Sequence, residues 1–108
     1  MSVQDTIKQQ VEGHPVVLYM KGSPQQPMCG FSATAAQILN MCGATDVFTV
    51  DVLRDPEIRE GIKQYANWPT IPQLYVKGEF VGGADIMYEM FQSGELAGLL
   101  KEKGVAAA

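Results

Sequence analysis

A short apolar run, PVVLYM at residues 15–20, is the feature that most constrains the fold of this chain. It contains no charged residue and is rich in β-branched side chains, which is typical of a strand covered on both faces. A second such run, VFTVDV, occupies residues 47–52. Between the two runs, apolar residues recur at the spacing of a helix that Gly43 can end: Phe31, Ala35, Ile38, Leu39 and Cys42. This order predicts a right-handed crossover between two parallel strands.

Two further helices are predicted on either side of this unit. Residues 3–12 carry one apolar stripe at helical spacing, and Gly13 can stop that helix; the stripe consists of Val3, Ile7 and Val11. Residues 55–57, Asp-Pro-Glu, provide an N-cap, a proline at the first helical position and an early acid. This second helix is expected to end near Asn67.

The C-terminal third predicts a hairpin followed by two helices. The runs at 73–76 and 79–82 flank Lys77-Gly78, a tight-turn signal for two antiparallel strands. Asp85 can cap the next helix, and a short last helix is predicted from its leucines, Leu96, Leu99 and Leu100. Residues 105–108 are expected to fray. One mixed four-stranded sheet with helices on both faces, an α/β fold, satisfies this order.

Length and charge exclude several classes of protein. The chain has 108 residues, room for one domain, and a formal charge of −4, which argues against a general nucleic-acid or acidic-membrane surface. The start of the chain lacks the pattern of a signal peptide, and no apolar run approaches the roughly 20 residues of a membrane span. Two cysteines are too few for a disulfide framework, so we expect free thiols in a reducing, cytoplasmic compartment.

Cys29 stands alone in KGSPQQPMCGFS, residues 21–32, where a C-x-x-C motif would have a second cysteine in place of Ser32. It lies where a loop enters a predicted helix, so unpaired N–H groups and the helix dipole favour its thiolate. Lys21, at the carboxyl end of the strand, can add positive charge. A reactive thiol is therefore favoured over a buried, inert one.

Cys42 is interpreted differently, because it lies on the apolar stripe of the predicted helix. A helix between the two cysteines would separate them by about 18 Å along its axis, whereas a disulfide needs Cα atoms within roughly 7 Å. We therefore expect no disulfide between them, and a core role for Cys42 in preference to that of a resolving thiol.

Two more stretches each allow two interpretations. Residues 68–72, WPTIP, are either a trans-proline turn before an edge strand or a cis turn that leaves the Ile71 backbone free for an extended ligand. Residues 82–85, GGAD, are either a hairpin exit with a helix cap or a backbone surface whose helix N-terminus holds a carboxylate. The residues alone leave both choices open.

Taken together, the motifs KGSPxxPxCGFS, DPEIR and YANWPTIPQLYVKGEFVGGAD resemble those of the monothiol glutaredoxins of the CGFS type. They agree in order and spacing across roughly residues 5–101, so the resemblance implies a single glutaredoxin domain over residues 1–108 with that core. It also implies a thioredoxin fold in which Pro72 is cis.

The same resemblance implies a function. Two chains would share one two-iron, two-sulfide (2Fe–2S) cluster, each contributing one cysteine and one noncovalently held glutathione, and would deliver it to apo iron–sulfur acceptor proteins, with BolA-like proteins as partners. The alternative is a glutathione-dependent oxidoreductase in which Cys29 takes glutathione from mixed disulfides. We expect this activity to be weak, because residues 23–27, SPQQP, would crowd the approach of a second glutathione.

The resemblance also implies roles for individual residues. Cys29 would be both the metal ligand and the reactive thiol, while Lys21 and Arg59 would bind the glycine carboxylate of glutathione. The backbone of Ile71 would pair with the cysteinyl part of glutathione, and Ala84 and Asp85 would receive the γ-glutamyl end. Many relatives have cysteine where this chain has Ala84, so a second redox thiol near the site is not expected.

Overall fold

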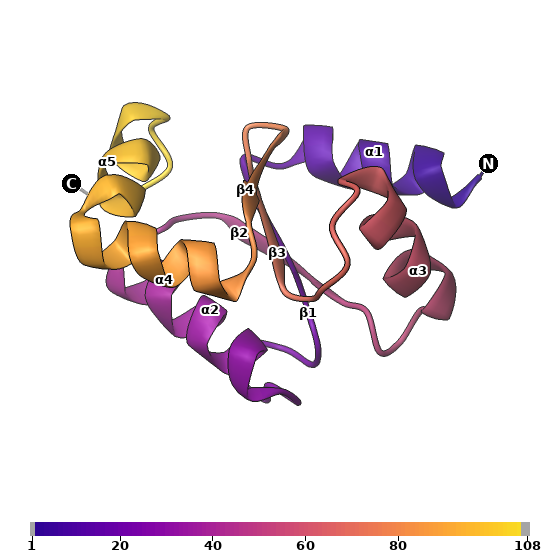
Figure 1. Ribbon diagram of the computed structural model, residues 1–108. Coiled ribbons are helices and arrows are strands. Elements are labelled where there is room, and N and C mark those ends of the chain that lie inside the picture. The colour runs from indigo at the N-terminus through magenta and orange to yellow at the C-terminus, as the bar shows by residue number, and fades with distance from the viewer. Residues whose placement is uncertain (1, 107–108) are drawn as a thin grey trace.

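The structure is a computed structural model that describes residues 2–106, and its elements follow the predicted order (Figure 1). The helices are α1 (Val3–Gly13), α2 (Gly30–Met41), α3 (Pro56–Tyr65), α4 (Ala84–Ser93) and α5 (Glu95–Glu102). The strands are β1 (Val16–Met20), β2 (Val47–Asp51), β3 (Gln73–Val76) and β4 (Glu79–Gly82). None of the helices within residues 2–106 is both long and apolar enough to span a membrane.

The four strands form one mixed sheet in the order β2-β1-β3-β4. β1 pairs with β2 in parallel, as the crossover predicts, and with β3 in the antiparallel sense, with Tyr19 opposite Gln73. β3 and β4 form the predicted hairpin, whose turn residues Lys77 and Gly78 both have positive φ, 50° and 83°. Since β1 has a neighbour on each side, it is a central strand.

Side-chain alternation along β1 divides the interior into two cores. Val17 and Tyr19 face a layer formed by α1 and α3, where the buried helical residues are Ile7, Val11, Ile58 and Ile62. Val16, Leu18 and Met20 face the opposite layer, which is formed by α2, α4 and α5 and includes Ile38, Leu39, Met87, Leu96 and Leu100. Figure 1 shows the sheet between these two groups of helices. The predicted α/β sheet with helices on both faces is confirmed.

The start of α4 differs from the prediction. Its N-cap is Gly83, and Asp85 lies in the first turn of the helix instead of capping it. The reason is the close packing of residue 83 against the turn before β3: a Cβ there would lie 3.1 Å from Trp68 Nε1 and 3.3 Å from the Pro72 carbonyl oxygen. The N-cap residue of the helix therefore has no side chain and makes no side-chain capping hydrogen bond.

The expectation that the C-terminal tail frays is wrong for its first two residues. Val105 is 3% exposed; its N–H donates to the Leu100 carbonyl at 2.9 Å and its carbonyl accepts from the Thr45 N–H at 2.9 Å. Ala106 forms a bridge with Ala44. Residues 107–108 lie outside the described residues. A residue near a chain end is ordered when its side chain packs into the core and its backbone is hydrogen-bonded.

We therefore expect Val105→Ala to lower the free energy of unfolding by roughly 1–3 kcal/mol, because two buried methyl groups are lost. Urea denaturation followed by circular dichroism measures this change. Lys101→Ala, at an exposed position of α5, serves as the control and should leave stability within about 0.5 kcal/mol of the wild-type value. Equal stability of Val105→Ala and the wild-type protein would contradict a core role for Val105.

Candidate functional site

Cys29 is the N-cap residue of α2, at the end of the loop that leaves β1. Its backbone is extended, with φ −157° and ψ 137°, and its side chain makes no capping hydrogen bond. The thiol is partly exposed. A sulfur atom at this position faces the first N–H groups of the helix, which have no partner within the helix itself.

This environment lowers the pKa of the Cys29 thiol below its ordinary value. The backbone N–H of Ser32 is the largest cause; slight burial opposes it, while the Phe31 N–H, the Lys21 charge and the Ser32 hydroxyl add to the lowering. The sequence prediction of a favoured thiolate is supported by the same two causes, helix N–H groups and a nearby lysine.

Ser32 occupies the place of a second thiol and has a structural role of its own. It is fully buried, and its Oγ accepts a hydrogen bond from the Lys21 N–H at 3.0 Å. This bond joins the residue that follows β1 to the first turn of α2. It therefore fixes Lys21 close to the helix terminus that carries Cys29.

A groove of about 200 Å³ lies beside this terminus. It is lined by the turn before β3, the start of α4 and one aromatic side chain of α2: Phe31, Trp68, Thr70, Ile71, Pro72, Gly83, Ala84, Asp85 and Ile86. The Ile71–Pro72 bond is cis, as the resemblance implies. The Ile71 backbone forms no backbone hydrogen bond with another residue of the described range 2–106. Its N–H and carbonyl are thus free for an extended ligand.

Gln73 holds this turn in place and was missed at the level of the sequence. It is fully buried in β3, and its Nε2 donates to the carbonyls of Trp68 at 3.1 Å and Thr70 at 3.3 Å. Its Oε1 accepts from the Tyr75 hydroxyl at 2.9 Å. A glutamine in an otherwise apolar strand was the available signal, because a buried amide needs partners.

The structure brings together three of the predicted binding residues, Ile71, Ala84 and Asp85, in one groove. Lys21 lies close enough to Cys29 to influence its thiol electrostatically, but it is not part of the groove lining. Arg59 lies on α3, half-buried, and is not part of the groove lining either. The two predicted carboxylate-binding cations are therefore outside the groove proper.

Trp68 both packs and lines the groove. Its ring lies 5.6 Å from that of Phe80. Its buried Nε1 has no hydrogen-bond partner within the described part of the chain. Buried indole N–H groups usually have a partner, so this donor is an unusual feature of the groove.

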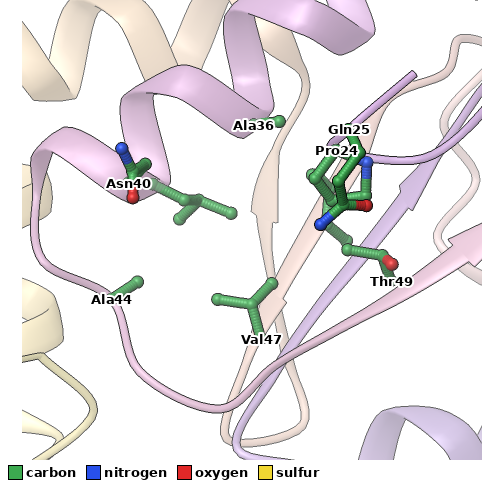
Figure 2. Close-up of a pocket in the computed structure, with 9 residues that line it drawn as sticks. Pro24, Gln25, Ala36, Asn40, Ala44, Val47 and Thr49 are labelled. Atoms are coloured by element: carbon green, nitrogen blue, oxygen red, sulfur yellow. The ribbon is translucent and has the colours of Figure 1, made fainter. Parts of the chain in front are cut away.

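The segment expected to crowd Cys29 packs elsewhere. Pro24 and Gln25 line a separate cavity of about 260 Å³ between α2 and β2, with Asn40, Val47 and Thr49 among its other walls (Figure 2). The tip of the 23–27 segment therefore packs toward the β2 edge and takes no part in lining the groove. Met28 and Phe31, each 63% exposed, are the bulky side chains nearest in sequence to Cys29.

Cys42 lies at the C-terminal end of α2, half-buried against the core. Burial raises the pKa of its thiol, opposite to the shift at Cys29. Both cysteines are free, as predicted.

His14 stacks on Phe48 with ring centroids 3.9 Å apart, and no group of three or more potential metal ligands occurs among the described residues.

Comparison with known proteins identifies the family to which the chain is similar. The family model described as Glutaredoxin matches residues 16–81. The chain is 53% identical to "Glutaredoxin 4" of Haemophilus ducreyi over 94% of each chain, and 52% identical to "Monothiol glutaredoxin-5, mitochondrial" of Schizosaccharomyces pombe over 92% of this chain and 69% of that protein. Its fold matches the solution structure of reduced poplar apo GrxS14 with a TM-score of 0.80, at 44% identity, over 94% and 92% of the two chains.

The thiol pKa values of the two cysteines are shifted in opposite directions, and this difference can be tested directly. In Cys42→Ser the remaining Cys29 should titrate below the ordinary thiol pKa of about 8.5, and in Cys29→Ser the remaining Cys42 should titrate above it. The rate of alkylation by iodoacetamide, measured from pH 5 to 10, reports each thiolate. If Cys42 became reactive at lower pH than Cys29, the assignment of the activated thiol would be wrong.

Proposed function

Because the chain belongs to the glutaredoxin family and resembles its monothiol members, we propose that it carries a 2Fe–2S cluster, bound between two copies with glutathione, and delivers it to acceptor proteins. The observation that carries the proposal is the lone, partly exposed Cys29 with a lowered pKa beside an open groove. A thiolate at this terminus is available as a ligand for iron without a neighbouring cysteine that could close a disulfide.

Ligand counting supports a shared cluster. A 2Fe–2S cluster is usually held by four sulfur ligands, and one chain offers a single activated thiolate. Two chains supply two thiolates, and two glutathione molecules supply the others. Ligands that are not part of the polypeptide can be replaced by the cysteines of an acceptor protein, which favours transfer over permanent binding.

The residues around the groove suit glutathione, an extended tripeptide with a carboxylate at each end. The free N–H and carbonyl of Ile71 can pair with its cysteinyl residue as a neighbouring strand would. The N-terminus of α4, at Ala84, can hold the γ-glutamyl carboxylate, and the Asp85 carboxylate can accept from the γ-glutamyl ammonium group. Lys21 and Arg59 supply positive charge for the glycine carboxylate.

In this proposal, residues 1–108 act as a single glutaredoxin domain with a core at about 5–101. The functional unit is a homodimer held together mainly by the cluster, and the partners are apo iron–sulfur proteins and BolA-like proteins. The free state of both cysteines suits the reducing cytoplasm. Neither nucleic acid nor a membrane is part of the proposed mechanism.

The lowered pKa of Cys29 also favours a second activity, reduction of protein–glutathione mixed disulfides. The Cys29 thiolate would attack the glutathione sulfur, which releases the protein thiolate and forms a Cys29–glutathione disulfide. A second glutathione thiolate would then attack that glutathione sulfur, giving glutathione disulfide and regenerating the Cys29 thiolate. We expect this turnover to be slow beside cluster delivery, because the bulky exposed side chains of Met28 and Phe31 lie next to Cys29 in the chain and can hinder the second glutathione.

The cluster proposal predicts different outcomes for the two cysteine variants. Protein reconstituted anaerobically with iron, sulfide and glutathione should show the visible absorbance of a 2Fe–2S cluster and elute as a dimer from a size-exclusion column. Cys29→Ser should lose both properties, whereas Cys42→Ser should retain them because Cys42 is half-buried in the α2 layer.

Equal loss of iron and sulfide in the two variants would contradict this division of roles. Rapid reduction of glutathione mixed disulfides, together with no transfer of cluster to an apo-ferredoxin, would support the oxidoreductase function instead.

The carboxylate contacts give a further prediction. Lys21→Glu and Arg59→Glu should each weaken glutathione binding about 10-fold to 100-fold, because a hydrogen bond to a charged group, worth about 1.5–3 kcal/mol, becomes a repulsion. Isothermal titration calorimetry measures the dissociation constant. Lys63→Glu makes the same charge change on α3, where Lys63 pairs with Glu60, and is the matched control. Unchanged affinity in both site variants would place the carboxylate elsewhere.

A further inference from the structure

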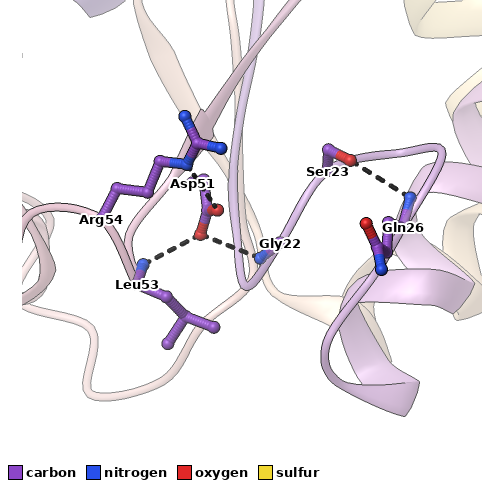
Figure 3. Close-up of polar contacts among 6 residues, drawn as sticks. All are labelled: Gly22, Ser23, Gln26, Asp51, Leu53 and Arg54. Carbon is purple, nitrogen blue, oxygen red and sulfur yellow. Dashed lines mark hydrogen bonds and ion pairs between the residues drawn. The ribbon is translucent and has the colours of Figure 1, made fainter.

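Residues 21–28, which we call the arch, form a closed loop rather than an irregular connection. The Met28 N–H donates to the Lys21 carbonyl at 2.9 Å, and Gly22 and Pro27 form an antiparallel bridge. Ser23 and Gln26 exchange backbone hydrogen bonds at 3.2 and 3.1 Å, and the Ser23 hydroxyl accepts from the Gln26 N–H at 3.1 Å (Figure 3). The arch is therefore stiff within itself.

The arch can close only around a glycine at position 22. Gly22 has φ +88°, and a Cβ there would lie 2.5 Å from the Gln26 carbonyl oxygen and 2.8 Å from the Met28 nitrogen. The Gly22 N–H takes no part in the arch's own hydrogen bonds and points toward Asp51.

That N–H donates to Asp51, the last residue of β2, and Figure 3 shows the contact. The Gly22 N–H lies 2.9 Å from Asp51 Oδ1, and the same oxygen accepts from the Leu53 N–H at 3.0 Å. Asp51 Oδ2 lies 3.7 Å from Nε of Arg54, whose side chain is 88% exposed. One carboxylate oxygen thus joins the arch to the chain segment that leaves β2.

The arch has open space on two sides. A cavity of about 260 Å³ lies beside its tip, and one of about 500 Å³ lies between its base and the end of β2, where Thr49, Asp51 and Arg54 form the far wall. The polar contacts at the base are two adjacent hydrogen bonds, Lys21 N–H to Ser32 and Gly22 N–H to Asp51. Together they hold the N–H groups of Lys21 and of the residue that follows it.

We propose that Asp51 is a positioning residue for the glutathione site: its carboxylate fixes the arch to β2 and thereby holds Lys21 in a constant place relative to Cys29. Asp51 itself does not contact the ligand in this proposal. The inference rests on the proposed function for its ligand, while the anchoring contact is a property of the free chain.

Calorimetric titration of glutathione into a set of variants tests this role. Asp51→Ala removes the shared acceptor and should weaken binding about tenfold. Asp51→Asn keeps an oxygen acceptor for both N–H groups and should stay within about threefold of the wild-type protein. Arg54→Ala removes the ion pair alone and should bind like the wild-type protein. If Asp51→Ala does not fold, Asp51→Ser takes its place, because the shorter serine side chain holds its oxygen too far from the two N–H groups to accept from both.

A double-mutant cycle with Lys21→Ala separates positioning from general destabilisation. If Asp51 acts through Lys21, adding Asp51→Ala to Lys21→Ala should weaken glutathione binding no further. Losses that multiply in the double variant would overturn the proposal, as would unchanged affinity in Asp51→Ala or a loss in Asp51→Asn equal to that in Asp51→Ala.

Amide hydrogen exchange of the free protein tests the anchor without any ligand. The Gly22 amide should exchange at least about tenfold faster in Asp51→Ala and near its wild-type rate in Asp51→Asn. Unchanged exchange in Asp51→Ala overturns the anchoring role. A wild-type chain that does not bind glutathione contradicts the proposed function, and the exchange measurement still decides whether Asp51 holds the arch.

Discussion

The burial of β1 on both faces is the constraint on which the rest of the molecule depends. All five of its residues are fully buried, and the strand pairs with β2 on one side and β3 on the other. Because β1 ends where the antiparallel β3 begins, the loop that leads to Cys29 emerges beside the turn that contains Ile71 and Pro72. As a result of this register, the thiol and the groove lie at the same end of the sheet.

The order of helices and strands could be predicted because it depends on local periodicity. The runs at residues 15–20 and 47–52 and the helix start at Asp55 all appear in the structure near their predicted bounds. The start of α4 and the order of Val105 could not be predicted, because they depend on distant contacts, with Trp68 and with Thr45 respectively. The resemblance correctly indicated the fold and the cis bond before Pro72.

The site was only partly predictable for a similar reason. The lone cysteine, the start of the helix and the lysine are close in sequence, so the lowered pKa of the Cys29 thiol could be predicted from their spacing. The residues that hold the surrounding backbone in place are different: Gln73 and Asp51 are polar residues at the ends of strands, and their partners lie in other segments. A polar residue in an apolar strand indicates that such an anchor exists, but the sequence does not give its partners. The structure identifies them, because each buried backbone N–H or carbonyl group can be matched to the side chain that bonds it.

Trp68 is the one tryptophan of the sequence, and its indole N–H has no partner within residues 2–106 although it lies at the wall of the groove. The emission of an indole depends on the polarity and hydrogen bonding around its ring. The chain therefore contains an intrinsic fluorescent probe at the wall of this groove, with no other tryptophan to obscure the signal. A molecule that binds at this groove can therefore be followed through this fluorophore on unlabelled, unmodified protein.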